Sequence, residues 1–362
     1  MMSMKLTERS KKYGYEVWES DEYKLFKSKG ANYVFNKKTG VMSSWGTELK
    51  DDPEYFPAPT ILDIEVSTIC SKGCKFCYKS NLPTGHNMSL EEFKHTVDIL
   101  PKSVTQIAFG SGYYGTENPE IYNMMDYARS KGIIPNITVG CLTGESADEF
   151  AKRVGAIAIS VYDKDVAYNS VKMMSDRGIS QTNIHFMIAD ETYEKALSVI
   201  EDASRDPRLA KLNAIVFLSL KTKGRAVEGG FHQLSQEKFD NLVAKAREFN
   251  VGIGFDSCSS LKAFEAFKGD KKIAQMIEPC ESGILSFYIS SYGKGYSCSF
   301  TEGYQHGKFD WREGIDVLEC KDSEDFLDKV WHHKKVEEFR NALLKSRKCN
   351  QYDCRTCPLY KI

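Results

Sequence analysis

Polar and apolar positions follow two different patterns along the chain. Within residues 13–45 the apolar residues form short, strand-like groups, such as Tyr15 with Val17, followed by a turn at 36–40. This pattern is typical of a small β-ribbon. From Ile61 onward, apolar runs alternate with amphipathic stretches, which predicts an α/β fold with a parallel sheet or barrel. The six predicted strands are Ile61–Ser67, Gln106–Phe109, Ile133–Val139, Ala156–Val161, Asn183–Ile188 and Leu212–Leu220.

Helices are predicted between these strands by capping residues and by apolar positions three or four residues apart. Ser89 and Glu92 form a capping box before one helix, and Pro119 and Gly132 bracket another. The later segments indicate a helix with the apolar stripe Phe239, Leu242, Val243 and Ala246, a strand at Val251–Phe255, a helix at Leu261–Phe267 and a hairpin at Leu285–Phe300 that turns at Gly293–Gly295.

We therefore expect three units. Residues 1–56 form an N-terminal β-ribbon arm, residues 57–270 a partial (β/α)6 TIM-like barrel, and residues 271–362 a smaller cysteine-rich unit.

Length and charge narrow the function classes. The chain has 362 residues, 41% of them hydrophobic, so it can bury a substantial core. Its formal charge of -1 gives no broad electrostatic footprint for nucleic acid or an anionic membrane. No stretch approaches the roughly 18 consecutive apolar residues of a membrane span. Residues 1–12 are polar rather than signal-like, so we expect a cytoplasmic protein.

Cysteine usage points to metal or redox chemistry. The chain has 11 cysteines, an odd number, and it is long, so a secreted disulfide framework does not fit. Three cysteines lie together at residues 70–77 and five lie between residues 280 and 357. This distribution predicts two groups of metal ligands.

The first predicted strand has one polar face. Asp63, Glu65 and Ser67 alternate with apolar residues and so share a side of the strand. Because a buried parallel strand should be apolar on both faces, we expect this side to face a barrel lumen that handles a polar ligand. An edge strand in solvent is the alternative.

Cys70, Cys74 and Cys77 follow this strand directly, in the pattern CxxxCxxC. Thiolates are the usual ligands of iron-sulfur clusters, and three thiolates on one loop can bind one face of a cube. Three ligands for four irons leave one iron open, which is what a cluster that binds substrate needs. A zinc loop is the alternative, with His86 as the only nearby candidate for a fourth ligand.

With Phe76 in its aromatic position, this motif resembles that of the radical S-adenosylmethionine (SAM) superfamily. The resemblance implies that Cys70, Cys74 and Cys77 hold a catalytic [4Fe-4S] cluster whose open iron chelates the amino and carboxylate groups of SAM. An electron from the cluster then releases a 5′-deoxyadenosyl radical, which abstracts hydrogen from the substrate. It also implies a flavodoxin or ferredoxin as the reductant.

The resemblance extends to residues that contact SAM. The family carries a Gly-Gly-Glu stretch after the second strand, where this chain has Gly110, Gly112 and a displaced acid, Glu117. Glu117 is either the substitute acid or a helix-start residue. The resemblance implies the following SAM contacts: Phe76, Gly110, Gly112, Glu117, Ser160 and Met187. His185, two positions before Met187, lies near the reaction cavity or is a structural histidine.

The second cysteine group resembles a SPASM or twitch auxiliary-cluster domain. Cys280 precedes the predicted hairpin, Cys298 lies on its returning strand, and a CxxC loop follows at Cys354 and Cys357. A full SPASM domain has more cysteines, so we expect one auxiliary [4Fe-4S] cluster held by these four residues, with Cys349 as the leading substitute. A closed zinc site on the same four thiolates is the alternative.

Three cysteines stand apart from both groups. Cys141 and Cys320 are expected to be plain packed or surface cysteines. Cys258 follows a predicted strand at the mouth of the barrel, and it is either a ligand of substrate or cluster, or a packed thiol.

The auxiliary domain favours a peptide or protein as the substrate, as in a maturase of ribosomally made peptides. Residues 218–226 resemble the corresponding segment of the peptide-modifying branch of the superfamily. The N-terminal arm, with Tyr33, Phe35 and Trp45, either adds a strand to an extended peptide or covers the barrel. Two other functions stay open: radical chemistry on a small metabolite or nucleotide-derived substrate, and a non-catalytic zinc-binding interaction protein.

Overall fold

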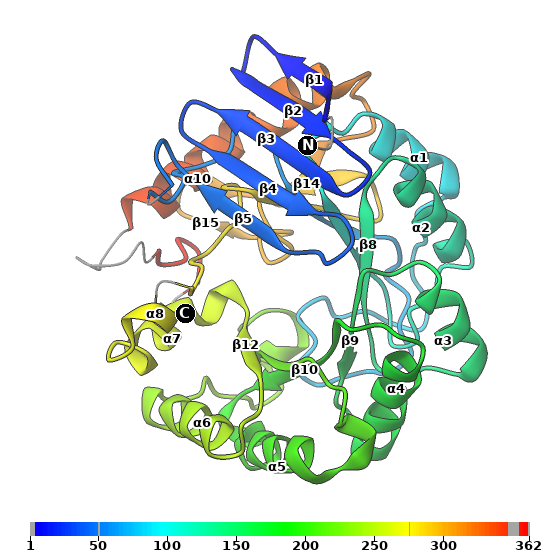
Figure 1. The fold of residues 1–362 in the computed structure, drawn as a ribbon, viewed down its shortest axis with the longest axis vertical. Coiled ribbons are helices and arrows are strands. Elements are labelled where there is room, and N and C mark those ends of the chain that lie inside the picture. The colour runs from blue at the N-terminus through cyan, green and yellow to red at the C-terminus, as the bar shows by residue number, and fades with distance from the viewer. Residues whose placement is uncertain (1–3, 50, 275, 347–354, 361–362) are drawn as a thin grey trace.

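The computed structural model describes residues 4–49, 51–274, 276–346 and 355–360. Within these residues the fold is mixed α/β, with a parallel sheet of β/α units preceded by antiparallel strands, which confirms the predicted fold class (Figure 1). None of the helices in the described residues has the length and apolar content needed to cross a membrane.

The N-terminal arm is a five-stranded antiparallel sheet in chain order. Its strands are β1 (Lys5–Ser10), β2 (Tyr15–Glu19), β3 (Tyr23–Ser28), β4 (Asn32–Asn36) and β5 (Met42–Trp45). Aromatic residues of alternate positions, including Tyr15, Phe26 and Tyr33, fill the side that packs on the rest of the protein and are fully buried.

The arm covers the amino ends of the parallel strands. The Lys24 ammonium donates to the carbonyl of Val104 at 2.5 Å, and the Tyr33 hydroxyl donates to the carbonyl of Ser103. Both carbonyls come just before the second parallel strand. The opposite end of the barrel, where the strands finish, is therefore the end left for a site, as is usual in β/α barrels.

The parallel strands follow one another in the sheet in chain order. They are β6 (Ile61–Glu65), β7 (Gln106–Gly110), β8 (Ile134–Val139), β9 (Ala156–Ser160), β10 (Thr182–Ile188), β11 (Ala214–Ser219) and β12 (Ile253–Phe255). The helices around them are α1 (Leu90–Asp98), α2 (Ile121–Ser130), α3 (Gly144–Ala151), α4 (Lys164–Asp176), α5 (Tyr193–Arg205), α6 (Gln236–Glu248) and α7 (Ser260–Ala266). Figure 1 shows α1 to α6 along the outside of the curved sheet.

The predicted helix signals hold in the structure. The Ser89 and Glu92 capping box begins α1, with both of its hydrogen bonds present. The predicted stripe of α6 is the buried face of that helix. Within the described residues, four short 3-10 helices lie in the loops: η1 (Asp190–Thr192), η2 (Pro207–Leu209), η3 (Gly224–Val227) and η4 (Ser257–Ser259).

The C-terminal segment extends the same sheet. After α8 (Lys271–Ala274), strand β13 (Ser286–Ile289) pairs in parallel with β6, and β14 (Lys294–Tyr296) returns antiparallel to β13 as the predicted hairpin. Strand β6 is thus flanked by β7 and β13, so the alternative of an edge strand in solvent is wrong. The remaining elements are β15 (Gln305–His306), β16 (Phe309–Asp310), β17 (Ile315–Asp316), α9 (Ser323–Phe326), the π-helix η5 (Leu327–Trp331) and α10 (Lys334–Lys345).

Candidate active site

The loop Cys70–Cys77 leaves the carboxyl end of β6 and brings three thiols together. The Cys77 amide donates to the carbonyl of Cys74 at 3.2 Å, which folds the loop back on itself. All three cysteines are partly exposed. Burial, and to a smaller extent the neighbouring Cys77 and Cys70, raise the pKa of Cys74. The three sulfurs are therefore near enough to influence one another.

A segment from the far side of the barrel clamps this loop. The Arg225 guanidinium donates to the carbonyls of Cys74 at 2.8 Å and Asn81 at 2.9 Å, and the Arg225 amide donates to the carbonyl of Cys77 at 3.0 Å. At Gly224 (φ +60°) a Cβ would lie 2.4 Å from the carbonyl oxygen of Tyr78, so only glycine lets the two backbones approach this closely. Sequence reasoning missed the clamp. Its only local signal was a glycine and a cation directly after a predicted strand.

Aromatic rings surround the loop. Phe76 stacks on Tyr162 with ring centroids 6.1 Å apart and meets the edge of Phe231 at 5.6 Å. The Tyr162 hydroxyl donates to the Cys74 sulfur, and burial is the main cause that raises the pKa of this tyrosine. The Lys72 ammonium lies 4.6 Å from the centroid of the Tyr113 ring. Tyr162, just past the end of β9, was also missed from the sequence.

The glycine-rich segment after β7 lies against the cysteine loop. At Gly112 a Cβ would fall 2.3 Å from the carbonyl oxygen of Ile69, directly before Cys70. Glu117 folds back over this segment, where it accepts from the Tyr114 amide at 2.8 Å and from the Ser111 hydroxyl at 3.3 Å. Helix α2 has Glu120 as its N-cap and no acidic residue in its first turn, so the helix-start interpretation of Glu117 is wrong.

The remaining predicted SAM contacts lie near the same loop. Gly110 ends β7 beside Glu65, which its hypothetical Cβ would approach to 3.0 Å. Ser160 ends β9 and hydrogen-bonds to Tyr162. Met187 and Phe76 pack against one small apolar group made of Ala189, Leu220 and Ala226.

His185 lies on the lumen side of β10, opposite Ser160 in the register. Its Nδ1 is 3.2 Å from the Thr138 hydroxyl. Burial lowers its pKa to about 4, so the imidazole is neutral at pH 7. It thus makes the hydrogen bond expected of a structural histidine, and its place near the reaction cavity stays a prediction.

Partly buried charged side chains connect the two cysteine regions. The Lys79 ammonium is 3.2 Å from Glu65, forms a shorter ion pair with Glu302 and donates to the Tyr288 hydroxyl at 2.7 Å. Because Lys79 follows Cys77 closely and Glu302 follows Cys298 closely, this network couples the position of one cysteine group to the other. Glu65, predicted to face the lumen, is 5% exposed and also accepts from Tyr288 at 3.0 Å.

The second cysteine group surrounds a cavity of about 190 Å³. Cys280, Cys298 and Cys357 line it, as does Cys258. Cys354 and Cys349 lie outside the described residues.

Backbone amides point at three of these sulfurs. Cys280 accepts from Ser282, Cys298 from Phe300 and Thr301, and Cys357 from Leu359 and Tyr360, the last at 3.4 Å. Burial raises the pKa of Cys280 to about 11 and of Cys298 to about 12. The Ser297 hydroxyl, which also lines the cavity, is buried and has no hydrogen-bond partner among the described residues. Converging thiols, amide donors and an unsatisfied hydroxyl fit an iron-sulfur group in this cavity.

Among the described residues, no three His, Cys, Asp or Glu side chains are grouped closely enough to hold a single metal ion. Thiolates on one zinc ion share a centre at about 2.3 Å, whereas the thiolates of a cluster each bind a different iron.

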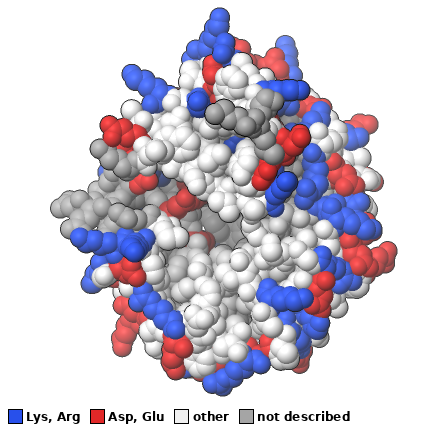
Figure 2. All heavy atoms as spheres, in the orientation of Figure 1, with Lys and Arg blue, Asp and Glu red and all other residues white. Residues whose placement is uncertain are grey.

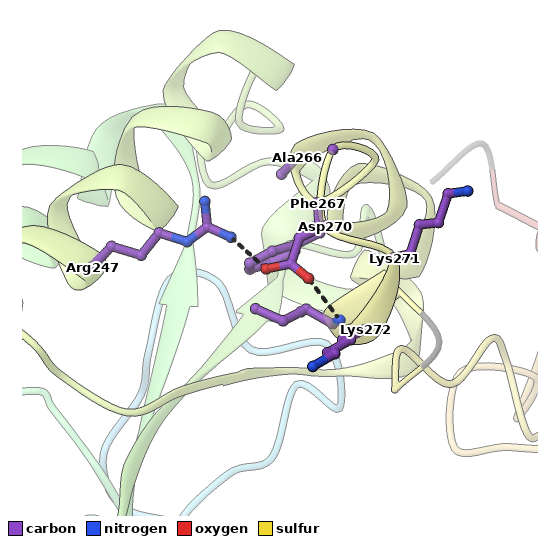
Figure 3. A pocket seen from close by; sticks show the side chains of 8 residues that line it. Arg247, Ala266, Phe267, Asp270, Lys271 and Lys272 are labelled. Atoms are coloured by element: carbon purple, nitrogen blue, oxygen red, sulfur yellow. Dashed lines mark hydrogen bonds and ion pairs between the residues drawn. The ribbon is translucent and has the colours of Figure 1, made fainter.

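Another cavity, of about 580 Å³, lies at α7 and α8, and none of the predicted site residues lines it. Among its charged side chains, Arg247 pairs with Asp270 at 3.9 Å (Figure 3). Figure 2 shows a hollow near the centre of the viewed face, with uncharged residues around most of it and charged side chains spread over the periphery.

Comparisons with known proteins agree with this site. Residues 64–222 match the family model of the Radical SAM superfamily. No curated protein matches the chain.

The chain is similar to several solved structures. Streptococcus suis SuiB bound to S-adenosylmethionine has 16% identity and a TM-score of 0.60, over 90% of this chain and 73% of that chain. SuiB bound to its precursor peptide SuiA has 15% identity and a TM-score of 0.60, over 82% and 70%. Native anSMEcpe with bound AdoMet and Cp18Cys peptide has 13% identity and a TM-score of 0.56, over 83% and 88%. At these identities the likeness shows the fold. The family match shows a Radical SAM superfamily domain within residues 64–222.

Proposed function

We propose that this radical SAM enzyme modifies a residue of a peptide or protein, as a maturase of ribosomally made peptides does. The observation that carries the proposal is the pair of thiol groups, one on the Cys70–Cys77 loop and one around the 190 Å³ cavity. The fold likeness to SuiB, solved with its precursor peptide, and to anSMEcpe, solved with a peptide, supports a peptide substrate.

The catalytic [4Fe-4S] cluster would be held by Cys70, Cys74 and Cys77. These three thiols share one loop, which leaves a fourth corner without a protein ligand from it. When bound, the cluster and SAM would supply the 5′-deoxyadenosyl radical. The protein's own residues hold the loop in place through Arg225 and shape it through Gly224.

We assign the SAM contacts to the residues that surround this loop. Glu117 and the segment from Gly110 to Gly112 lie on one side of it, where a carboxylate and open backbone suit an amino group. Phe76 and Met187 form an apolar wall on another side, which suits an adenine ring. Ser160 would add a hydroxyl contact from the end of β9.

The C-terminal part would form a SPASM- or twitch-like unit with one auxiliary [4Fe-4S] cluster. Cys280, Cys298 and Cys357 line its cavity, and the CxxC pattern adds Cys354. In this proposal the chain is divided at residues 1–56, 57–270 and 271–362, works in the cytoplasm and receives electrons from a flavodoxin or ferredoxin.

Anaerobic reconstitution tests the proposal. Iron-loaded, reduced protein should be brown and should convert SAM to 5′-deoxyadenosine, measured by chromatography. Short peptides encoded beside the gene, co-expressed with the enzyme, should change in mass. A colourless, zinc-loaded protein that forms no 5′-deoxyadenosine would contradict the catalytic assignment. Turnover with a small metabolite, without any peptide change, would contradict the substrate class.

A further inference from the structure

Cys258 lies outside both cysteine groups of the sequence, where a ligand of substrate or cluster and a packed thiol were the two alternatives. It sits in η4, directly after β12 at the end of the barrel, 22 positions before Cys280. Its side chain nevertheless lines the same cavity as Cys280, Cys298 and Cys357. Four thiols from four separate segments thus face one space of about 190 Å³.

The surroundings of Cys258 differ from those of the other three thiols. The Lys221 ammonium donates to the Cys258 sulfur and forms an ion pair with Asp256. Lys221 is only 6% exposed. Asp256 is fixed in turn by the Ser259 hydroxyl at 2.6 Å and the Ser219 amide at 3.2 Å. The ends of β11 and β12 are therefore tied together around this one thiol.

The buried charge of Lys221 determines which form of Cys258 the surroundings favour. An ammonium taken out of water is costly unless anionic partners compensate it, and one carboxylate already faces Lys221. A neutral packed thiol gains little from a second, charged neighbour, whereas a thiolate is stabilised by it. Burial raises the pKa of Cys258 well above its usual value, and the charge of Lys221 opposes this rise, as backbone amides do for Cys280, Cys298 and Cys357.

We propose that Cys258 is a ligand of the auxiliary [4Fe-4S] cluster and completes its set with Cys280, Cys298 and Cys357, in the place that the CxxC pattern gives to Cys354. Lys221 is then a positioning residue that orients Cys258 and offsets its negative charge. This inference rests on the auxiliary site of the proposed function. It changes one ligand, and it ties the auxiliary cluster to the barrel rather than to the C-terminal segment alone.

Iron content tests the ligand. We would purify and reconstitute the full chain anaerobically as wild type, Cys258→Ala, Cys354→Ala and Cys320→Ala, and measure iron and sulfide per chain. Wild type should hold about eight irons, and Cys258→Ala about four. Cys354→Ala and the control Cys320→Ala, which removes a buried cysteine outside the cavity, should match wild type.

The possible outcomes distinguish a failure of this ligand assignment from a failure of the proposed auxiliary site. Full iron in Cys258→Ala, or loss of half the iron in Cys354→Ala, overturns the proposal while the auxiliary site stands. About four irons in the wild type would instead overturn the auxiliary site itself. Should Cys258→Ala fail to fold, as judged by circular dichroism, Cys258→Ser keeps the size of the side chain. It should change the electron paramagnetic resonance signal of the reduced auxiliary cluster, and an unchanged signal overturns the proposal.

The role of Lys221 is tested by measuring the reduction potential of the auxiliary cluster rather than the activity of the enzyme. Lys221→Met removes the charge next to one ligand sulfur, so the reduction potential of the auxiliary cluster should become more negative, with iron content retained. Potentiometric titration followed by electron paramagnetic resonance measures this shift. An unchanged potential would contradict the positioning role.

Discussion

The two thiol groups of this protein are built in opposite ways. Cys70, Cys74 and Cys77 come from one loop of eight residues, partly exposed at the end of β6. The thiols of the second cavity come from distant segments and are met by buried amides or by the Lys221 ammonium. A short open loop leaves room for a small-molecule ligand. A group closed from several sides holds its cofactor away from solvent and suits a redox or structural role.

The largest effect should come from removing one cysteine of the Cys70–Cys77 loop. Cys74→Ala removes a central thiolate of the loop, so we expect 5′-deoxyadenosine formation to be abolished and about half of the iron to be lost. Chromatography of the reduced, SAM-loaded protein measures the first. Cys141→Ala is the matched control, because Cys141 is another partly exposed cysteine, outside both groups. Full turnover by Cys74→Ala would refute the catalytic assignment.

The clamp on the open loop should have the next largest effect. Arg225→Ala removes two charge-assisted hydrogen bonds to the carbonyls of Cys74 and Asn81, each worth about 1.5–3 kcal/mol. We expect lower iron retention at this loop and 5′-deoxyadenosine formation reduced on the order of tenfold. Arg225→Lys keeps the charge but loses the fork that spans both carbonyls, so it should lie between wild type and Arg225→Ala. Equal activity in all three proteins would contradict the role of the Arg225 hydrogen bonds in holding the loop.

The two groups also differ in how far the sequence predicts them. The CxxxCxxC loop is local, so spacing alone was enough to single it out. The strands and helices of the barrel were predicted for the same reason, since the Ser89 and Glu92 cap and the apolar stripe of α6 lie within single segments.

What the sequence missed depends on contacts between distant residues. The pairing of Ser286 with Ile61 joins segments more than 200 positions apart, and no local pattern specifies it. Arg225, Tyr162 and the ion pair of Lys79 with Glu302 are likewise defined by what the fold brings to them. Their residue types are common on loops, so spacing cannot separate them from ordinary surface side chains.

The backbone contact between Gly224 and Tyr78 can be tested by measuring the free energy of unfolding. Gly224→Ala adds a Cβ 2.4 Å from the carbonyl oxygen of Tyr78, at φ +60°, so it should lower the free energy of unfolding by about 2–4 kcal/mol. Gly230→Ala is the matched control, because it has φ +71° but no atom within 4 Å of the added Cβ. It should cost only about 1–2 kcal/mol. Denaturant unfolding of both variants measures the difference. Equal losses would show that the loop and the segment at Gly224 are not in rigid contact.

The smallest expected effect concerns His185, which lies on β10 beside Thr138. Burial lowers its pKa from 6.5 to about 4, so the folded protein resists a proton that the unfolded chain accepts. The free energy of unfolding should therefore fall as the pH drops from about 6.5 toward 4, and this part of the loss should be absent from His185→Asn. Denaturant unfolding at pH 7 and pH 5 measures it. His306→Asn, which changes an exposed histidine, should keep the wild-type pH dependence. The same slope in His185→Asn and wild type would mean that water reaches His185 and solvates its imidazolium.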